Sequence, residues 1–232
     1  MCNRYTPSRW DDPVFAALGR AVVNFPPGNF AKIGPFGSGV FIRCRADGQF
    51  EGVVGQWGMI RPGSKLRKPL PKQARVILTN NARSETIAEK LTYRQSWSNG
   101  QRCIIPAWEF DEPCYETGPK NVWWEFRRAD GTPWGIAGIW SEWTDPETGE
   151  IVPSYSMPTV NADAHPLMSR MHKPDPQLPP NKQDKRSIVP LQPSDWMQWL
   201  RGSVEDAWSL LRVPPEVVFD AGPEHRNMGL LL

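Results

Sequence analysis

Cysteine is scarce in this sequence, and its few copies are scattered. The four cysteines, which contain no Cys-x-x-C pair, are Cys2, Cys44, Cys103 and Cys114. Zinc sites and disulfide frameworks use clustered or regularly spaced cysteines, so the sequence favours neither. We therefore expect reduced thiols, no metal and no cofactor.

Long apolar runs are also lacking. No stretch approaches the roughly 18 apolar residues of a membrane span. The opening segment contains Pro7 and has no apolar core of the kind found in secretory signals. Net charge is small as well, because 27 basic and 25 acidic side chains leave a formal charge of +2. These absences predict a cytoplasmic protein that does not contact membranes.

One segment, in contrast, lacks acidic side chains altogether. Residues 52–84 contain no Asp or Glu, but they carry the basic side chains Arg61, Lys65, Arg67, Lys68, Lys72, Arg75 and Arg83. Such a stretch can follow a phosphate backbone even in a nearly neutral protein. It can equally be a solvated loop, and composition leaves both interpretations open.

The hydrophobic pattern predicts strands joined by tight turns. Asp-Gly pairs at 47–48 and 130–131 separate β-rich runs and predict hairpins over 40–59 and 122–143. Other strands are expected at 75–79, 103–106, 151–160 and 188–191, and short helices at 13–18, 85–91, 196–200 and 204–211. We predict a single α+β domain over 1–232, with C-terminal helices from about 193. Its sheet is expected to be antiparallel and barrel-like, with peripheral helices.

The second residue offers a distinctive chemistry. If Met1 is removed, Cys2 carries a free α-amine beside its thiol. The amine can condense with an aldehyde to an imine, and the thiol can then close a five-membered thiazolidine. The reference pKa of an α-amine is about 7.7–8.0, so part of it is nucleophilic near neutral pH. Ring closure within one residue also gains from proximity.

Several motifs resemble one family in order and spacing. The sequence begins Met-Cys-Asn-Arg-Tyr and continues with Trp-Gly-Met-Ile at 57–60, Asn-Ala-Arg-Ser-Glu-Thr at 81–86 and Arg-Cys-Ile-Ile-Pro-Ala at 102–107. Phe-Asp-Glu at 110–112, Gly-Ile-Trp at 138–140, Thr159 and Arg-Met-His at 170–172 follow. This pattern resembles the SRAP family of abasic-site-processing, SOS-associated proteins over most of residues 2–200. The resemblance implies an SRAP-like, half-open barrel.

The resemblance also implies a function. It suggests a monomer that binds single-stranded DNA, joins Cys2 to the ring-opened aldehyde of an abasic site as a thiazolidine, and so shields the lesion during the SOS response. Such a protein would associate with the nucleoid when bound to DNA.

The same resemblance implies residue roles. Cys2 corresponds to the crosslinking residue, Asn81 to the asparagine that positions sugar and cysteine, Glu112 to the general acid or base, and His172 to the histidine that assists proton transfer. A carboxyl group and an imidazole suit the proton transfers of imine formation. The residues expected to contact DNA or hold the site are Arg4, Arg83 and Thr159, together with Arg61 of the basic stretch and Trp57 as a stacking platform.

Three departures from the family pattern leave alternatives open. Asn3 replaces the usual glycine after the cysteine. Glu109 is a rival to Glu112, because acids occur at 109, 111 and 112. The segment 173–184 interrupts the motif after His172, so that His165 becomes a second candidate.

Other functions also fit parts of the sequence. A thiol peptidase that cleaves its own Met1–Cys2 bond, an N-terminal-cysteine amidotransferase and a non-catalytic module for single-stranded DNA are the alternatives. The amidotransferase predicts an early Cys-Gly-Ile-type continuation, which this chain lacks.

Overall fold

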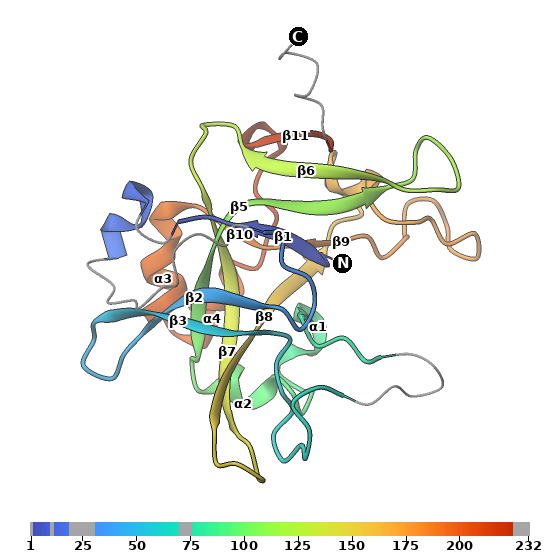
Figure 1. The fold of residues 1–232 in the computed structure, drawn as a ribbon. Coiled ribbons are helices and arrows are strands. Elements are labelled where there is room, and N and C mark those ends of the chain that lie inside the picture. Colours follow the sequence, from blue (N-terminus) through green and yellow to red (C-terminus); the bar gives the residue numbers. More distant parts are fainter. Residues whose placement is uncertain (1, 10–11, 19–30, 70–75, 225–232) are drawn as a thin grey trace.

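A computed structural model describes residues 2–9, 12–18, 31–69 and 76–224 (Figure 1). Its strands are β1 (Arg4–Pro7), β2 (Ser38–Cys44), β3 (Phe50–Trp57), β4 (Asn81–Arg83), β5 (Arg102–Cys114), β6 (Val122–Arg128), β7 (Trp134–Thr144), β8 (Ile151–Asn161), β9 (Arg186–Ile188), β10 (Pro190–Leu191) and β11 (Phe219–Pro223). The α-helices are α1 (Ser84–Ile87), α2 (Arg94–Ser98), α3 (Trp196–Arg201) and α4 (Val204–Ser209). The 3₁₀ helices are η1 (Pro13–Leu18), η2 (Met168–Arg170), η3 (Pro193–Asp195) and η4 (Glu216–Val218).

The strands form an 11-stranded sheet that closes on itself. Its order is β10-β7-β8-β3-β2-β5-β6-β11, and an additional β5–β7 pairing joins β7, β8, β3, β2 and β5 into a ring. The long strand β5 continues beyond the ring to pair with β1 and β6. The predicted α+β class with a barrel-like sheet is therefore confirmed (Figure 1).

One of the two predicted hairpins is present, because β2 pairs with β3 around Asp47-Gly48. The chain also turns at Asp130-Gly131, but the hairpin predicted there is wrong. β6 pairs with β5 and β11, and β7 pairs with β5, β8 and β10, so the two strands do not pair with each other. Gly48 and Gly131 have φ values of 81° and 74°. These left-handed conformations favour glycine, which is why the Asp-Gly pairs identified the turns.

The sheet differs from the expectation in two respects. β8 runs parallel to both β3 and β4, so the sheet is mixed rather than purely antiparallel. Residues 76–79 form no strand, and Val76, Ile77 and Leu78 are exposed. The apolar run there was misleading, because the paired strand starts later, at Asn81. Arg75 lies outside the described residues.

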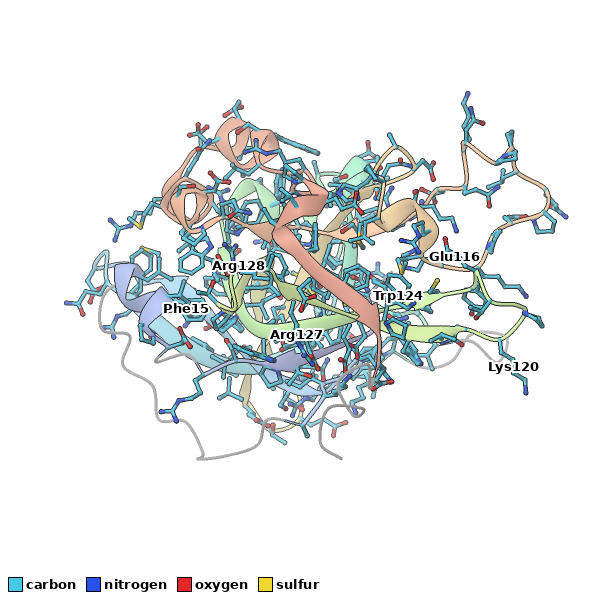
Figure 2. The ribbon with its side chains drawn as sticks, turned by 90° about the horizontal axis from the view of Figure 1, so that it is seen from above. Phe15, Glu116, Lys120, Trp124, Arg127 and Arg128 are labelled. Carbon is cyan, nitrogen blue, oxygen red and sulfur yellow. The ribbon has the colours of Figure 1, made fainter. Side chains whose placement is uncertain are left out.

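Helices cover part of the barrel. Trp196 and Trp199 of α3 are buried. Phe15 of η1, labelled in Figure 2, stacks on Trp196 with ring centroids 5.0 Å apart. Ser203 caps α4 in a capping box with Asp206. No helix in the described part of the chain is long and apolar enough to cross a membrane.

Candidate active site

Cys2 lies just before β1, inside the molecule rather than on its surface. The antiparallel pairing of β1 with β5 places Arg4 opposite Asp111 and draws the start of the chain over β5. The Cys2 side chain is fully buried, and its thiol donates to the backbone carbonyl of Arg4 at 3.4 Å. The position of Cys2 is therefore fixed by the sheet.

The Cys2 environment opposes ionisation of the thiol. Burial raises the pKa of Cys2 well above its usual range, and the negative charge of Glu112 raises it further. Asp111 acts in the same direction. The thiol is consequently protonated near neutral pH, and a neighbouring base is needed to remove its proton during reaction.

Two asparagine side chains hold the Cys2 carbonyl. The Nδ2 atom of Asn81 donates to this oxygen at 2.6 Å, and Nδ2 of Asn80 donates to it at 3.1 Å. Asn81 starts β4, while Asn80 immediately precedes it. The structure thus brings the sequence-predicted Asn81 to Cys2 and adds Asn80, which the sequence analysis did not select.

Glu112 and His172 form a hydrogen-bonded pair beside the buried thiol. Their Oε2 and Nε2 atoms are 2.7 Å apart, and Glu112 is fully buried. Side chains alternate between the faces of β5, so Glu112 shares its face with the core residue Phe110, whereas Glu109 lies on the other face. Glu109 accepts hydrogen bonds from Thr6 and Arg127 instead. The geometry favours Glu112 over Glu109.

The backbone of His172 is held in an uncommon conformation. Its φ is 62°, a left-handed value that non-glycine residues rarely adopt. Its N–H donates to the Pro113 carbonyl at 2.6 Å, and the ammonium of Lys185 donates to the carbonyls of Met171 and His172, each at 2.7 Å. These contacts fix the imidazole against Glu112. Lys185 is a second residue that the sequence analysis did not select, because no pattern distinguishes a lysine that binds two backbone carbonyls.

His165 has a different environment. Its Nδ1 accepts from the backbone N–H groups of Leu167 and Met168 at the start of η2, and its Nε2 contacts the Pro214 carbonyl at 2.9 Å. Both ring nitrogens are thus used in local structure. His172 fits the chemistry better than His165.

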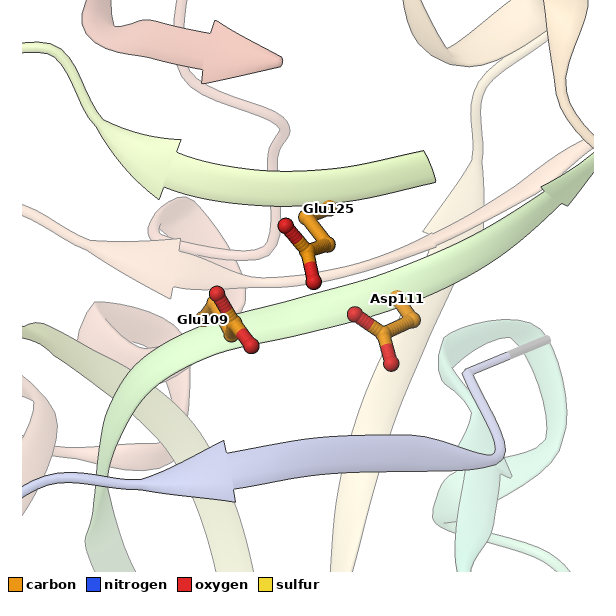
Figure 3. Close-up of side chains that lie close together, drawn as sticks. All are labelled: Glu109, Asp111 and Glu125. Atoms are coloured by element: carbon orange, nitrogen blue, oxygen red, sulfur yellow. The ribbon is translucent and has the colours of Figure 1, made fainter. Parts of the chain in front are cut away.

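An acidic cluster lies on the opposite face of β5. Figure 3 shows Glu109, Asp111 and Glu125 with their carboxylates directed toward one another. The ammonium of Lys32 lies 2.9 Å from Asp111 and 3.2 Å from Glu125, and Arg127 binds Glu109 at 2.7 Å. The cluster is therefore an ion-pair network whose cations are side chains of this chain.

Arg4 belongs to this network. Its guanidinium donates to Asp111 at 2.6 Å and to Glu224 at 2.8 Å, and it lies over the Trp123 ring, 4.1 Å from its centroid. These contacts tie β1 to β5 and β11. A DNA phosphate would have to compete with these two carboxylates for Arg4, and the DNA contact expected for this residue stays a prediction.

Trp57 also departs from the expectation. The ring is fully buried, and its indole N–H donates to the Asn80 carbonyl at 3.0 Å. A buried ring cannot stack on a DNA base, so the expected platform is a core residue. Its contact with Asn80 nevertheless links it to the Cys2 site.

The remaining DNA-binding candidates lie in different environments. Arg61 is exposed, and Arg83 is half exposed in a surface ion pair with Asp184 at 2.7 Å. Such pairs are weak and open readily to another anion. Thr159 is fully buried, and its hydroxyl has no hydrogen-bond partner within the described residues.

A groove lies next to the Asn80–Asn81 segment. It encloses about 660 Å³, and Thr79, which adjoins Asn80, is part of its wall. Its exposed apolar residues are Leu66, Ile77 and Leu91, and its basic residues are Arg61, Lys65, Arg67, Lys68 and Lys90. Much of the predicted basic stretch thus lines one groove, whose wall includes Thr79. Lys72 and Arg75 lie outside the described residues.

The segment 173–184 is a folded loop. The Gln183 amide donates to the carbonyls of Asp175, Leu178 and Pro179, so one side chain organises the loop from within. The loop and the β5–β6 connection together enclose a second hollow of about 570 Å³ beside His172. Figure 2 shows Glu116 and Lys120 on the β5–β6 connection, which extends outward.

Comparison with known proteins places this geometry in a family. A family model described as "SOS response associated peptidase (SRAP)" matches residues 1–223. The chain belongs to the SRAP family. Among curated relatives of this SRAP protein, the Abasic site processing protein HMCES of Xenopus tropicalis is 29% identical over 139 residues, covering 53% of this chain and 40% of the relative.

A bacterial relative gives a similar match. The Abasic site processing protein YoqW of Bacillus subtilis is 27% identical over 135 residues, covering 58% of this chain and 56% of the relative. The chain thus spans about half the length of these curated relatives.

Solved structures share the fold over nearly the whole chain. A Bordetella bronchiseptica protein of known crystal structure is 32% identical with a TM-score of 0.78, covering 96% of this SRAP chain and 99% of its own. A Bacteroides thetaiotaomicron protein is 20% identical with a TM-score of 0.74, covering 99% and 94%. The second likeness concerns the fold alone.

Proposed function

We propose that this protein captures abasic sites in single-stranded DNA through a thiazolidine at Cys2, after removal of Met1. Met1 itself lies outside the described residues. The names of the HMCES and YoqW relatives, both called abasic site processing proteins, support the same class of substrate.

One observation carries the proposal. Asn81 holds Cys2, which would present both an amine and a thiol. The negative charge of the buried Glu112, which is paired with His172, acts on the Cys2 thiol. A simple nucleophilic thiol would gain from a lowered pKa, but here burial raises the pKa of Cys2. An amine that attacks first, followed by a thiol that closes the ring, suits such a site better.

The proposed reaction consumes no oxidant or reductant. The Cys2 amine adds to C1 of the open-chain sugar, and the resulting carbinolamine loses water to give an imine. The thiol sulfur then bonds to the imine carbon while its proton passes to the ring nitrogen. The Glu112–His172 pair donates the proton to the departing water and accepts the proton of the thiol. Asn81 holds the residue that carries both nucleophiles.

The groove beside Asn80 supports a DNA strand as the substrate. Basic side chains on its wall attract phosphates, and exposed Leu66, Ile77 and Leu91 offer apolar surface to unpaired bases. A duplex hides its base faces in the stack, so this surface suits a single strand.

The test is a crosslinking assay with mature protein and a single-stranded oligonucleotide that contains one abasic site. A band that survives heat and denaturant is expected for the wild type, with a mass equal to protein plus DNA minus one water. Cys2→Ala should form no heat-stable band, while its amine still gives an imine that borohydride can trap. Cys44→Ala is the matched thiol control and should crosslink normally.

The alternatives give different results. Binding without crosslinking would indicate a non-catalytic module and overturn the proposal. Release of ammonia from glutamine would indicate an amidotransferase. Protein that retains Met1, or a tag before Cys2, should not crosslink, and adduct formation by such protein would contradict the amine-first mechanism.

A further inference from the structure

We propose that Asn80 is a second positioning residue for Cys2 and that Asn3 orients the Asn80 side chain. The inference deepens the proposed function and rests on it. It concerns a feature that distinguishes this chain, because Asn3 stands where the family pattern has glycine.

Asn80 contacts the N-terminal segment twice. Its Nδ2 donates to the Cys2 carbonyl at 3.1 Å and to Oδ1 of Asn3 at 3.2 Å. The Asn80 side chain is fully buried, so its bond to the Cys2 carbonyl is shielded from competition by water. Its bond to Asn3 is only partly buried, because Asn3 itself is half-buried. A glycine at position 3 would offer no side-chain acceptor, and the second bond would be lost.

The backbone of Asn80 is itself fixed. Its carbonyl accepts from the indole of Trp57 at 3.0 Å and from the N–H of Met157 at 2.9 Å. Trp57 is buried and Met157 belongs to β8, so the amide that reaches Cys2 is anchored to the barrel rather than to a loose loop.

Two amide donors on the Cys2 carbonyl restrict the rotation of this residue more than a single donor would. Asn81 bonds this oxygen at 2.6 Å and Asn80 at 3.1 Å, so rotation that moves the carbonyl breaks at least one bond. In the mature protein nothing precedes Cys2, and the direction of its amine follows from the orientation held at the carbonyl. The pair therefore aims the amine and thiol at one point, where proximity increases the rate of ring formation.

The same two side chains present acceptors as well as donors. The Oδ1 atoms of Asn80 and Asn81 are buried and have no hydrogen-bond partner within the described part of the chain. Unpaired buried acceptors are uncommon and call for a ligand or ordered water. A sugar hydroxyl or the N–H of the free amine would satisfy them, which matches a polar substrate at this position.

The test compares Asn80→Ala, Asn80→Asp and Asn3→Gly with wild type. Asn80→Asp keeps the shape of the side chain but replaces the Nδ2 donor by an oxygen, which can only accept. The single-turnover crosslinking rate at saturating DNA and the DNA Kd are measured separately, together with the Tm. The matched control is Ser96→Ala, which removes a buried polar group in α2, outside the contacts of Cys2.

We expect Asn80→Ala and Asn80→Asp to slow the crosslinking step about three- to tenfold, because the hydrogen bond to the Cys2 carbonyl is lost together with the bond to Asn3. The Kd should change less than about twofold, because Asn80 is not expected to contact DNA. Asn3→Gly should slow it about twofold. Combining Asn3→Gly with Asn80→Ala should add little to Asn80→Ala alone, since the two residues act through one bond. Unchanged rates in both Asn80 variants, or rates that fall only in parallel with Tm or Kd, would overturn the inference.

A second arm separates this inference from the proposed function. Mature protein without DNA is incubated with glycolaldehyde, and thiazolidine formation at Cys2 is followed by mass spectrometry. If wild type reacts with the aldehyde but not with abasic DNA, the proposed function fails. The positioning role is then still judged by whether the Asn80 variants slow the aldehyde reaction and Ser96→Ala does not.

Discussion

Glu112 and His172 are separated by 60 residues in sequence, yet the Glu112 Oε2 and His172 Nε2 atoms lie 2.7 Å apart. The contact joins the end of β5 to His172. The preceding residue, Met171, forms an isolated antiparallel bridge with Cys114 of β5. A carboxyl group and an imidazole held this closely can exchange a proton, and His172 also lines a surface hollow.

Replacing Glu112 by Gln should slow crosslinking by about 10²-fold or more, because the amide cannot exchange protons in the reaction. Glu109→Gln is the matched control on the opposite face of β5 and should retain the wild-type rate. Both are measured as single-turnover rates at saturating abasic DNA. A larger loss in Glu109→Gln than in Glu112→Gln would show that the assignment is wrong.

His172→Asn should reduce the crosslinking rate by about 10²-fold. Asparagine tolerates the left-handed backbone at this position, so the imidazole is removed with little added strain. His165→Asn should lower the Tm, since the ring holds η2 and contacts Phe219, but should leave the rate at saturating DNA unchanged. The opposite pattern of rates would favour His165 as the proton-transfer residue.

The thiol of Cys2 should react with iodoacetamide only at unusually alkaline pH, since burial and Glu112 raise its pKa. In Glu112→Gln the midpoint should move to lower pH but stay above that of an ordinary thiol, because burial is the larger cause. Peptide mapping by mass spectrometry separates Cys2 from the partly exposed Cys44, which serves as internal reference. An unchanged midpoint would mean that the carboxylate does not act on this thiol.

The raised pKa of Cys2 also has a consequence for stability. The folded protein holds the thiol proton more tightly than the unfolded chain, whose thiol has a pKa of about 8.5. This contribution is fully present below that pH and decreases as pH rises toward the folded-state pKa. Wild type should therefore lose more free energy of unfolding than Cys2→Ala between about pH 8 and 10, as measured by urea unfolding. Equal losses in both proteins would contradict the burial of the thiol.

High salt should weaken the encounter with DNA but leave the completed linkage intact, because released counterions affect binding and not a formed bond. Arg61→Ala should raise the Kd and reduce the salt dependence by about one counterion. Arg45→Ala is the control, because this exposed arginine lies on the β2–β3 turn and pairs with Asp47. Equal salt slopes for wild type and Arg61→Ala would exclude Arg61 from the DNA path.

The turns show how far local pattern reaches, because the two Asp-Gly turns were predicted correctly but only the first joins two paired strands. Asp-Gly pairs gave both turns correctly because the left-handed backbone there is a local property of glycine. The strand expected at 75–79 was wrong, since an apolar run alone does not reveal whether a partner strand exists. Similarly, β1 and β11 were missed because their pairing with β5 and β6 depends on residues distant in sequence.

The order of its motifs, through their resemblance to the SRAP family, determined Cys2 and Asn81 as candidates and left Glu112 beside Glu109 and His172 beside His165. Only the tertiary structure favours Glu112 over Glu109 and His172 over His165, since the two faces of β5 and the course of the chain after β8 bring Glu112 and His172 together. It also placed Trp57 in the core, paired Arg4 with Asp111 and Glu224, and brought Asn80 to Cys2. Burial and distance are properties of the packed chain, and residue types alone do not contain them.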